Sequence, residues 1–225
     1  RDFCLSRGLG DVYKRQVIGQ HTNLANCIYH DDYGAGKAMG QTVAGFSKKG
    51  IAYIGVTRDD KAAGAAREDG FIAGLKNTGI TLLEENKRTS AFTLESGYEA
   101  ALDLLESKCD IDVISCATDT IAAGAIEAIQ TYLKKQVPAN AADAGARMRY
   151  ILENTSIRVT GFGDNQMLKA VTGGIPTIHF GYKTSGIRGT ELLLDSIERG
   201  EQIPIEMKLG FHLVGTDLSD SENHT

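Results

Sequence analysis

Residues 51–80 read IAYIGVTRDDKAAGAAREDGFIAGLKNTGI, and this stretch decides the fold class. Its first six residues form a continuous apolar run, which is typical of a strand buried on both faces. An amphipathic stretch follows at residues 63–77, with Phe71 and Leu75 on one face, and Gly79 stands where a helix would end. A buried strand followed by a helix is the repeating unit of an α/β fold built on a parallel sheet.

The same alternation extends outward in both directions from this stretch. Upstream, we expect the end of a strand at residues 17–19 and a helix after Asp31 or Asp32, either of which can cap it. Downstream, the apolar runs predict strands at residues 80–83, 111–117, 157–162, 177–180 and 206–214. The amphipathic stretches predict helices at residues 95–106, 119–133 and 184–199. The chain is therefore expected to be α/β throughout.

Bulk composition excludes several classes of protein. The chain has 225 residues and a net charge of −5, which argues against a broad nucleic-acid-binding surface. No apolar run is long enough to span a bilayer, and the start lacks the pattern of a secretory signal. The cysteines form no CxxC pair and have no histidine at metal-ligand spacing, so we expect free thiols in a reducing cytosol and a cytoplasmic protein.

The N-terminal segment does not read as native protein. Residues 6–16, SRGLGDVYKRQ, match in all eleven positions the in-frame translation of a transposon-tagmentation sequencing adapter. Such segments are set aside before a fold is inferred. We therefore expect residues 1–16 to be a non-native segment and the native chain to resume at Val17.

Four kinds of functional site lack the residues or the spacing that they need. Gly34 to Lys37 resembles a phosphate loop, but Asp31 and Ala38 occupy the positions that need glycine and serine or threonine. The adjacent residues 30–32 cannot easily face one metal ion. No GxSxG elbow is present, and Cys116 lies inside an apolar strand with no base nearby in the sequence. We therefore expect no metal, no cofactor and no enzymatic activity.

Five segments together resemble the LacI/GalR family of bacterial transcriptional regulators. Their order and spacing match the family from Val17 to about Leu218, and their likeness is greatest to the repressors of sucrose and related operons. The segments are YHDDY at 29–33, AREDGF at 66–71, ATDTIAAGA at 117–125, VTGFGDN at 159–165 and TIHF at 177–180.

The resemblance implies a periplasmic-binding-protein-like type I fold, in which two doubly wound parallel-sheet subdomains enclose a ligand cleft. On this basis we expect residues 17–57 and 181–203 to form an incomplete N-terminal subdomain. Residues 58–180 and 204–218 would form the C-terminal subdomain, followed by a disordered tail at 219–225. The segment at 134–156 is longer than an ordinary connection and has no assigned role.

Three of the residues that the resemblance assigns to the effector site have a plain structural alternative. The carboxylate of Asp32 would accept hydrogen bonds from sugar hydroxyls, or it would simply cap a helix. The guanidinium of Arg67 would fork onto effector oxygens, or it would be a solvated helix arginine. The ring of Phe92 would stack on the apolar face of the sugar, or it would belong to the core.

The resemblance is less direct at three further positions. Thr118 stands where relatives often carry asparagine, so a hydroxyl replaces an amide, while Asp119 is expected to cap the next helix. Gly163 stands where many relatives carry aspartate, and Asp164 follows it, which implies a shifted carboxylate or a roomier pocket. Tyr182 matches an aromatic residue that would close the floor of the cleft.

The expected function is that of a sugar-sensing repressor core. A sugar effector would bind the chain, and operator DNA would be contacted only through an N-terminal headpiece missing from this chain. A homodimer is expected, because such repressors read two half-sites related by two-fold symmetry. The alternative is a periplasmic sugar-binding protein of an ABC transporter, since the same fold serves both functions.

Overall fold

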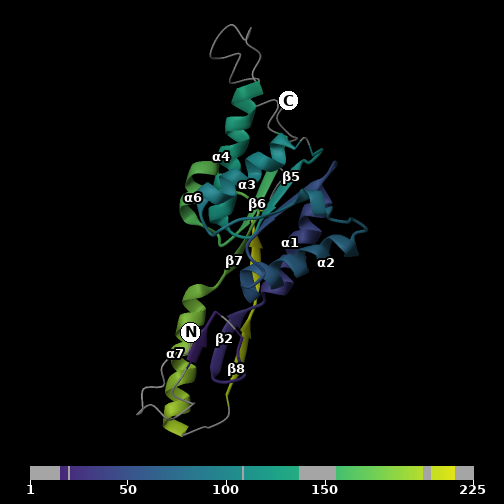
Figure 1. Cartoon of the computed structure of the whole chain (residues 1–225). Coiled ribbons are helices and arrows are strands. Elements are labelled where there is room, and N and C mark those ends of the chain that lie inside the picture. Colours follow the sequence, from purple (N-terminus) through teal and green to yellow (C-terminus); the bar gives the residue numbers. More distant parts are fainter. Residues whose placement is uncertain (1–15, 20, 108, 137–155, 200–203, 216–225) are drawn as a thin grey trace, which may run out of the picture. The chain divides into compact units, whose positions relative to one another are not determined.

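A computed structural model describes residues 16–19, 21–107, 109–136, 156–199 and 204–215 (Figure 1). The chain divides into two compact units. The smaller is built from the residues up to Asp31 together with Phe180–Phe211, and the larger from Asp32–His179 together with the residues from His212 onward. The N-terminal segment at 1–15, most of the insertion at 134–156 and the tail from residue 216 lie outside the described residues.

The smaller unit is a three-stranded parallel sheet with one helix packed on it. Its strands are β1 (Gln16–Ile18), β2 (Asn26–His30) and β8 (Glu206–Leu209), in the order β1-β2-β8. Helix α7 (Tyr182–Arg199) packs on this sheet. Its buried Ser196 accepts a 2.9 Å hydrogen bond from the side chain of Asn26, whose amide oxygen accepts from Ile205 N.

The larger unit is built on a six-stranded sheet in the order β4-β3-β5-β6-β7-β9. The pairs β3–β4, β3–β5, β5–β6 and β6–β7 are parallel. Its strands are β3 (Ile51–Gly55), β4 (Lys87–Thr89), β5 (Val113–Cys116), β6 (Arg158–Phe162), β7 (Thr177–Phe180) and β9 (Phe211–Val214). The prediction of an α/β protein with parallel sheets is therefore confirmed.

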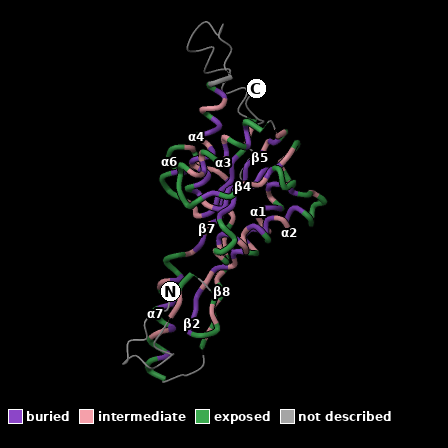
Figure 2. The backbone as a smooth tube through the Cα atoms, viewed as in Figure 1, coloured by how far each residue is buried: buried purple, intermediate pink, exposed green. Residues whose placement is uncertain are grey.

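Helices cover both faces of the six-stranded sheet. Figure 1 shows α1 and α2 on one side and α3, α4 and α6 on the other. Strands β3 and β5 are buried along their whole length (Figure 2), and the Tyr53 ring packs on Phe71 of α2 at 4.9 Å. The helices are α1 (Asp32–Phe46), α2 (Arg67–Asn77), α3 (Leu94–Glu106), α4 (Asp119–Gln136) and α6 (Gln166–Thr172).

Helices α1 and α2 cross at glycines that bring their backbones into contact. A Cβ added to Gly36 would lie 2.3 Å from the Arg67 carbonyl oxygen, and one added to Gly70 would lie 2.1 Å from that of Tyr33. Gly40 and Gly74 make the same kind of approach one turn further along. Glycine is required at this crossing because any side chain would overlap backbone atoms.

The sheet edge differs from the expectation. Residues 80–83 were predicted as a strand, but they are extended without sheet pairing, and the edge strand is β4. The prediction is wrong because an apolar run such as ITLL can pack on a core without joining a sheet. The true edge strand, Lys-Arg-Thr, is polar, as is common for strands with one unpaired side.

The division into units also differs from the expected one. Residues 32–57 were placed in the N-terminal subdomain, but β3 lies inside the six-stranded sheet, so this segment belongs to the larger unit. The strand expected at 206–214 is interrupted at Gly210, and β8 and β9 belong to different sheets. The alternation of apolar residues continues through residues 206–214, so the sequence pattern does not indicate where the chain passes from one sheet to the other. Among the described residues, no helix has the length and apolar character needed to cross a membrane.

Candidate functional site

Arg67 and Asp32 form a shielded ion pair in the larger unit. The Arg67 Nε donates to Asp32 Oδ1 at 2.8 Å, and the two side chains are only 12% and 9% exposed. The Arg67 Nη1 donates to the Ala117 carbonyl oxygen at 2.7 Å, and the guanidinium carbon lies 4.9 Å from the centre of the Phe162 ring. Arg67 is therefore not a solvated helix arginine. It ties the start of α1 to the residues that follow β5 and end β6.

The local sequence explains how Arg67 reaches this position. Residues Lys61–Ala66 form one turn of π-helix ahead of α2, and Asp60 caps it by accepting from the backbone N–H groups of Ala62 and Ala63. Turns of π-helix inserted in α-helices are frequent at functional sites. The close glycine crossing of α1 and α2 then brings Arg67 within reach of Asp32, the first residue of α1.

Thr118 lies between β5 and α4 and Asp119 is the first residue of α4, and both side chains accept hydrogen bonds. The Thr118 hydroxyl accepts from Ile121 N at 3.2 Å, so Thr118 caps α4, and the expectation that Asp119 caps it is wrong. The Asp119 carboxylate instead accepts from Thr177 Oγ1 at 2.7 Å and from Asn165 N at 2.6 Å. Asp119 thus ties the start of α4 to β7 and to the turn after β6.

Burial makes the charged form of Asp119 unfavourable. Loss of hydration raises the pKa of this carboxyl above its ordinary 3.8, and the hydrogen bonds from Asn165 and Thr177 offset only part of that effect. Position 161 is a glycine, and a Cβ at this position would lie 2.2 Å from Asp119 Oδ1. The hydrogen bonds that Asp119 accepts from Asn165 and Thr177 therefore only partly offset the unfavourable free energy of burying its charge.

We expect the substitution Asp119→Asn to change how stability depends on pH. Because the pKa of Asp119 is raised in the folded state, its contribution to stability is full below the unfolded value of 3.8 and is lost as pH rises through the folded value. Asparagine is neutral throughout and shows no such loss. The free energy of unfolding of the variant minus that of the parent should therefore increase with pH above 3.8, measured by urea denaturation at several pH values. Parallel profiles for the two proteins would contradict this.

Asp164 lies in a turn of unusual backbone conformation at the carboxyl end of β6. Its φ is +51°, and that of the preceding Gly163 is +136°. The Asp164 carboxylate contacts the ring of His179 on β7, with Oδ2 2.9 Å from Nδ1. His179 belongs to the segment TIHF at 177–180, and no role was predicted for it.

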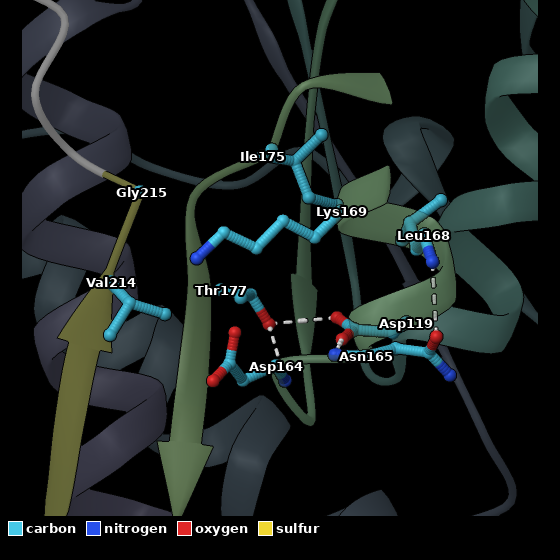
Figure 3. A pocket seen from close by; sticks show the side chains of 10 residues that line it. Asp119, Asp164, Asn165, Leu168, Lys169, Ile175, Thr177, Val214 and Gly215 are labelled. Atoms are coloured by element: carbon cyan, nitrogen blue, oxygen red, sulfur yellow. Dashed lines mark hydrogen bonds between the residues drawn. The ribbon is translucent and has the colours of Figure 1, made fainter. Parts of the chain in front are cut away.

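A small cavity lies beside this network (Figure 3). Its volume of about 40 Å³ has room for water-sized molecules, whereas pockets for small organic ligands typically measure ~300–1,000 Å³. The cavity is therefore too small to enclose a sugar. Its lining comprises Asp119, Asp164, Asn165, Leu168, Lys169, Gly174, Ile175, Thr177, Val214 and Gly215.

A larger cavity, of about 340 Å³, opens at the edge of the sheet between β4 and α2. The buried Glu68 in its lining binds Lys87 Nζ at 2.8 Å and Arg58 Nη1 at 3.3 Å, while Arg88 pairs with Asp103 outside the lining. The hydrogen bond to Glu68 raises the pKa of Lys87. None of the predicted site residues lines this cavity, which comprises Tyr53, Arg58, Glu68, Glu84, Lys87, Arg88 and Thr89.

Both predicted aromatic residues are exposed. Phe92, between β4 and α3, is 49% exposed and therefore does not belong to the core. Tyr182, the first residue of α7, is exposed in the smaller unit, where its ring lies edge-on to His30 at 5.4 Å. Five of the six predicted residues thus lie in the larger unit, and the structure joins Asp32 to Arg67 directly.

The described residues offer little for metal or thiol chemistry. They contain no group of three or more histidine, cysteine, aspartate or glutamate side chains placed to hold a metal ion. Cys27 and Cys116 are free thiols, as expected. Both are buried, and burial raises the pKa of the Cys116 thiol. A raised pKa keeps the thiol protonated and poorly nucleophilic.

Comparison with known proteins places this arrangement in a family. Residues 19–172 match the model of the periplasmic binding protein domain. The chain is 28% identical over 170 residues to the sucrose operon repressor of Staphylococcus xylosus, covering 76% of this chain and 47% of that protein. The chain therefore spans about half the length of this curated relative.

Solved structures share the fold at low sequence identity. The transcriptional regulator CelR in complex with cellobiose superposes with a TM-score of 0.72 at 19% identity, over 88% of this chain and 56% of that one. A LacI-family transcriptional regulator from Enterococcus faecium with bound ribose gives 0.68 at 17% identity, over 88% and 67% of the two chains. The predicted periplasmic-binding-protein-like fold is therefore confirmed.

Proposed function

The chain belongs to the periplasmic binding protein domain family, and we propose that it is the sugar-binding core of a LacI-type transcriptional repressor. The observation that carries the proposal is the Arg67 assembly. A guanidinium is held by Asp32 and by the Ala117 carbonyl oxygen, over the Phe162 ring, at the carboxyl ends of β5 and β6. Ligands of open α/β sheets bind outside the carboxyl ends of the strands.

The proposed effector is a small neutral sugar. A sugar offers many hydroxyl groups and a patch of C–H surface, which require fixed polar groups and an aromatic platform. Arg67 offers oriented donors, the carboxylates of Asp32 and Asp164 offer acceptors, and the Thr118 hydroxyl offers both. Phe92, in the same unit, supplies an exposed ring.

We further propose that the protein is a cytoplasmic homodimer in which the sugar controls binding to operator DNA. The curated relative is named as an operon repressor, which favours regulation over the alternative of a transporter's binding protein. A sugar can shift operator binding only if it binds the DNA-bound and the DNA-free states of the repressor with different affinities, and only by that difference. We propose no catalytic activity.

Calorimetric titration of the chain with sucrose, cellobiose and ribose tests the proposal. The expected result is saturable binding of at least one of these sugars with one site per chain. Galactitol serves as an acyclic polyol control, because it has hydroxyl groups but lacks a ring face for an aromatic residue. If none of the three sugars bound, the result would contradict the proposed function.

The substitution Phe92→Ala should weaken sugar binding and leave the fold intact. Loss of ring contact should cost ~1–3 kcal/mol of binding free energy, and the half-exposed side chain should contribute little to stability. Calorimetry beside a thermal melt measures both quantities. The matched control is Leu83→Ala, an equally exposed apolar residue of the same unit. A stability loss of ~3–5 kcal/mol would instead mark Phe92 as a core residue.

A further inference from the structure

The turn that carries Asp164 is held in a conformation that costs energy. A φ of +51° is left-handed, a region that aspartate tolerates better than most residues but does not prefer. Strained backbone of this kind persists only where surrounding contacts fix it. The contacts around Asp164 therefore indicate what the conformation serves.

Strand β7 supplies most of these contacts. Gly163 N donates to the Ile178 carbonyl oxygen at 2.8 Å, and Asp164 N lies 3.4 Å from Thr177 Oγ1. The next residue along the strand, His179, contacts the Asp164 carboxylate. Three successive residues of β7 thus hold the backbone and the side chain of one turn.

The hydrogen bond to His179 has a defined direction. A carboxylate only accepts, so Nδ1 of His179 must carry the proton and donate to Oδ2 of Asp164. Oδ1 receives no hydrogen bond from any other described residue. The ring of His179 therefore fixes the rotation of the carboxylate and leaves one oxygen available to a ligand hydroxyl.

We infer that His179 is a positioning residue for the effector site, which orients the Asp164 carboxylate toward a sugar hydroxyl. The inference rests on the proposed function and assigns a role to a residue outside the predicted site. His179 is also the last residue of the larger unit before the chain enters the smaller unit at Phe180. The same hydrogen bond therefore links the effector-contacting turn to the connection between the units.

The test compares two replacements of His179 in the full chain, with the tightest-binding of sucrose, cellobiose and ribose as the probe. His179→Leu removes the donor and should weaken binding about tenfold, the scale of one hydrogen bond to a charged group. His179→Asn places an amide N–H near the position of Nδ1 and should restore most of the affinity. The matched control is His212→Leu, an exposed histidine on β9 of the same unit, which should bind like the parent.

The background variant Asp164→Asn separates positioning from stability. If His179 acts through the Asp164 carboxylate, adding His179→Leu to Asp164→Asn should cost little further affinity. Additive losses would show that His179 acts elsewhere, and parent-like affinity of His179→Leu would overturn the inference while leaving the proposed function standing. A parent that binds none of the sugars would remove both. Thermal melts of each variant identify losses that come from unfolding.

Discussion

Replacing Arg67 by alanine is expected to destabilise the fold as well as to abolish most sugar binding. The Asp32 side chain is 9% exposed in the parent, and the substitution removes the Nε–H that donates to its carboxylate at 2.8 Å. Removing one partner of a shielded ion pair costs about 3–5 kcal/mol of stability. Loss of the guanidinium should cost a further 1.5–3 kcal/mol, roughly, in sugar binding, measured on the folded fraction.

Two companion variants separate charge from packing. Arg67→Met combined with Asp32→Asn removes both charges and should recover part of the stability that Arg67→Ala loses. Arg188→Ala breaks an exposed pair with Glu191 and should change stability by no more than about 0.5 kcal/mol. Urea denaturation gives the comparison. If Arg67→Ala were as harmless as Arg188→Ala, the solvated-arginine interpretation would be correct.

Adding a single methyl group at Gly70 is the second change with a large expected effect. The new Cβ would lie 2.1 Å from the Tyr33 carbonyl oxygen, and backbone atoms cannot rotate away as a flexible side chain can. We expect Gly70→Ala to cost about 3 kcal/mol of stability or more, the upper end for overpacked sites. Because the helices must separate to accommodate it, Arg67 should also lose its contact with Asp32, so sugar affinity should fall.

Gly45→Ala is the matched control on α1. A Cβ there meets nothing within 4 Å, and the residue is exposed near the end of the helix. Alanine should therefore stabilise the protein by ~0.5–1 kcal/mol through its higher helix propensity. In the same urea denaturation experiment, a loss of stability for Gly70→Ala and a gain for Gly45→Ala would support the close crossing of α1 and α2. Equal effects would contradict it.

The sequence predicted the fold class well because buried parallel strands and amphipathic helices leave strong periodic signals. IAYIGV at 51–56 and the helix after it illustrate this, since both were located to within a few residues. Short and polar elements leave weaker signals. Helix α6 has seven residues, too few for a clear period, although its Asn165 cap and its Gly173 at φ +78° are recognisable ends.

The candidate site was predicted as separate residues, and its connections were not. Asp32 and Arg67 were each assigned to a sugar, but their ion pair depends on a helix crossing set by Gly36 and Gly70. Those glycines were visible in the sequence with a four-residue repeat, Gly36–Gly40 and Gly70–Gly74, that predicts close helix packing. The contact between Asp164 and His179 depends on strand register, which no local pattern encodes.

The central claim is that a sugar binds at the Arg67 guanidinium, and arginine side-chain NMR tests it most directly. In a ¹⁵N–¹H spectrum, the Nε–H signal of Arg67 can be identified by its absence from Arg67→Lys. On titration with sucrose, cellobiose or ribose, this signal should shift and saturate with the binding curve, while that of Arg188 on α7 stays in place. A sugar that binds without moving the Arg67 signal, or an Arg67 signal indifferent to all three sugars, would contradict the account.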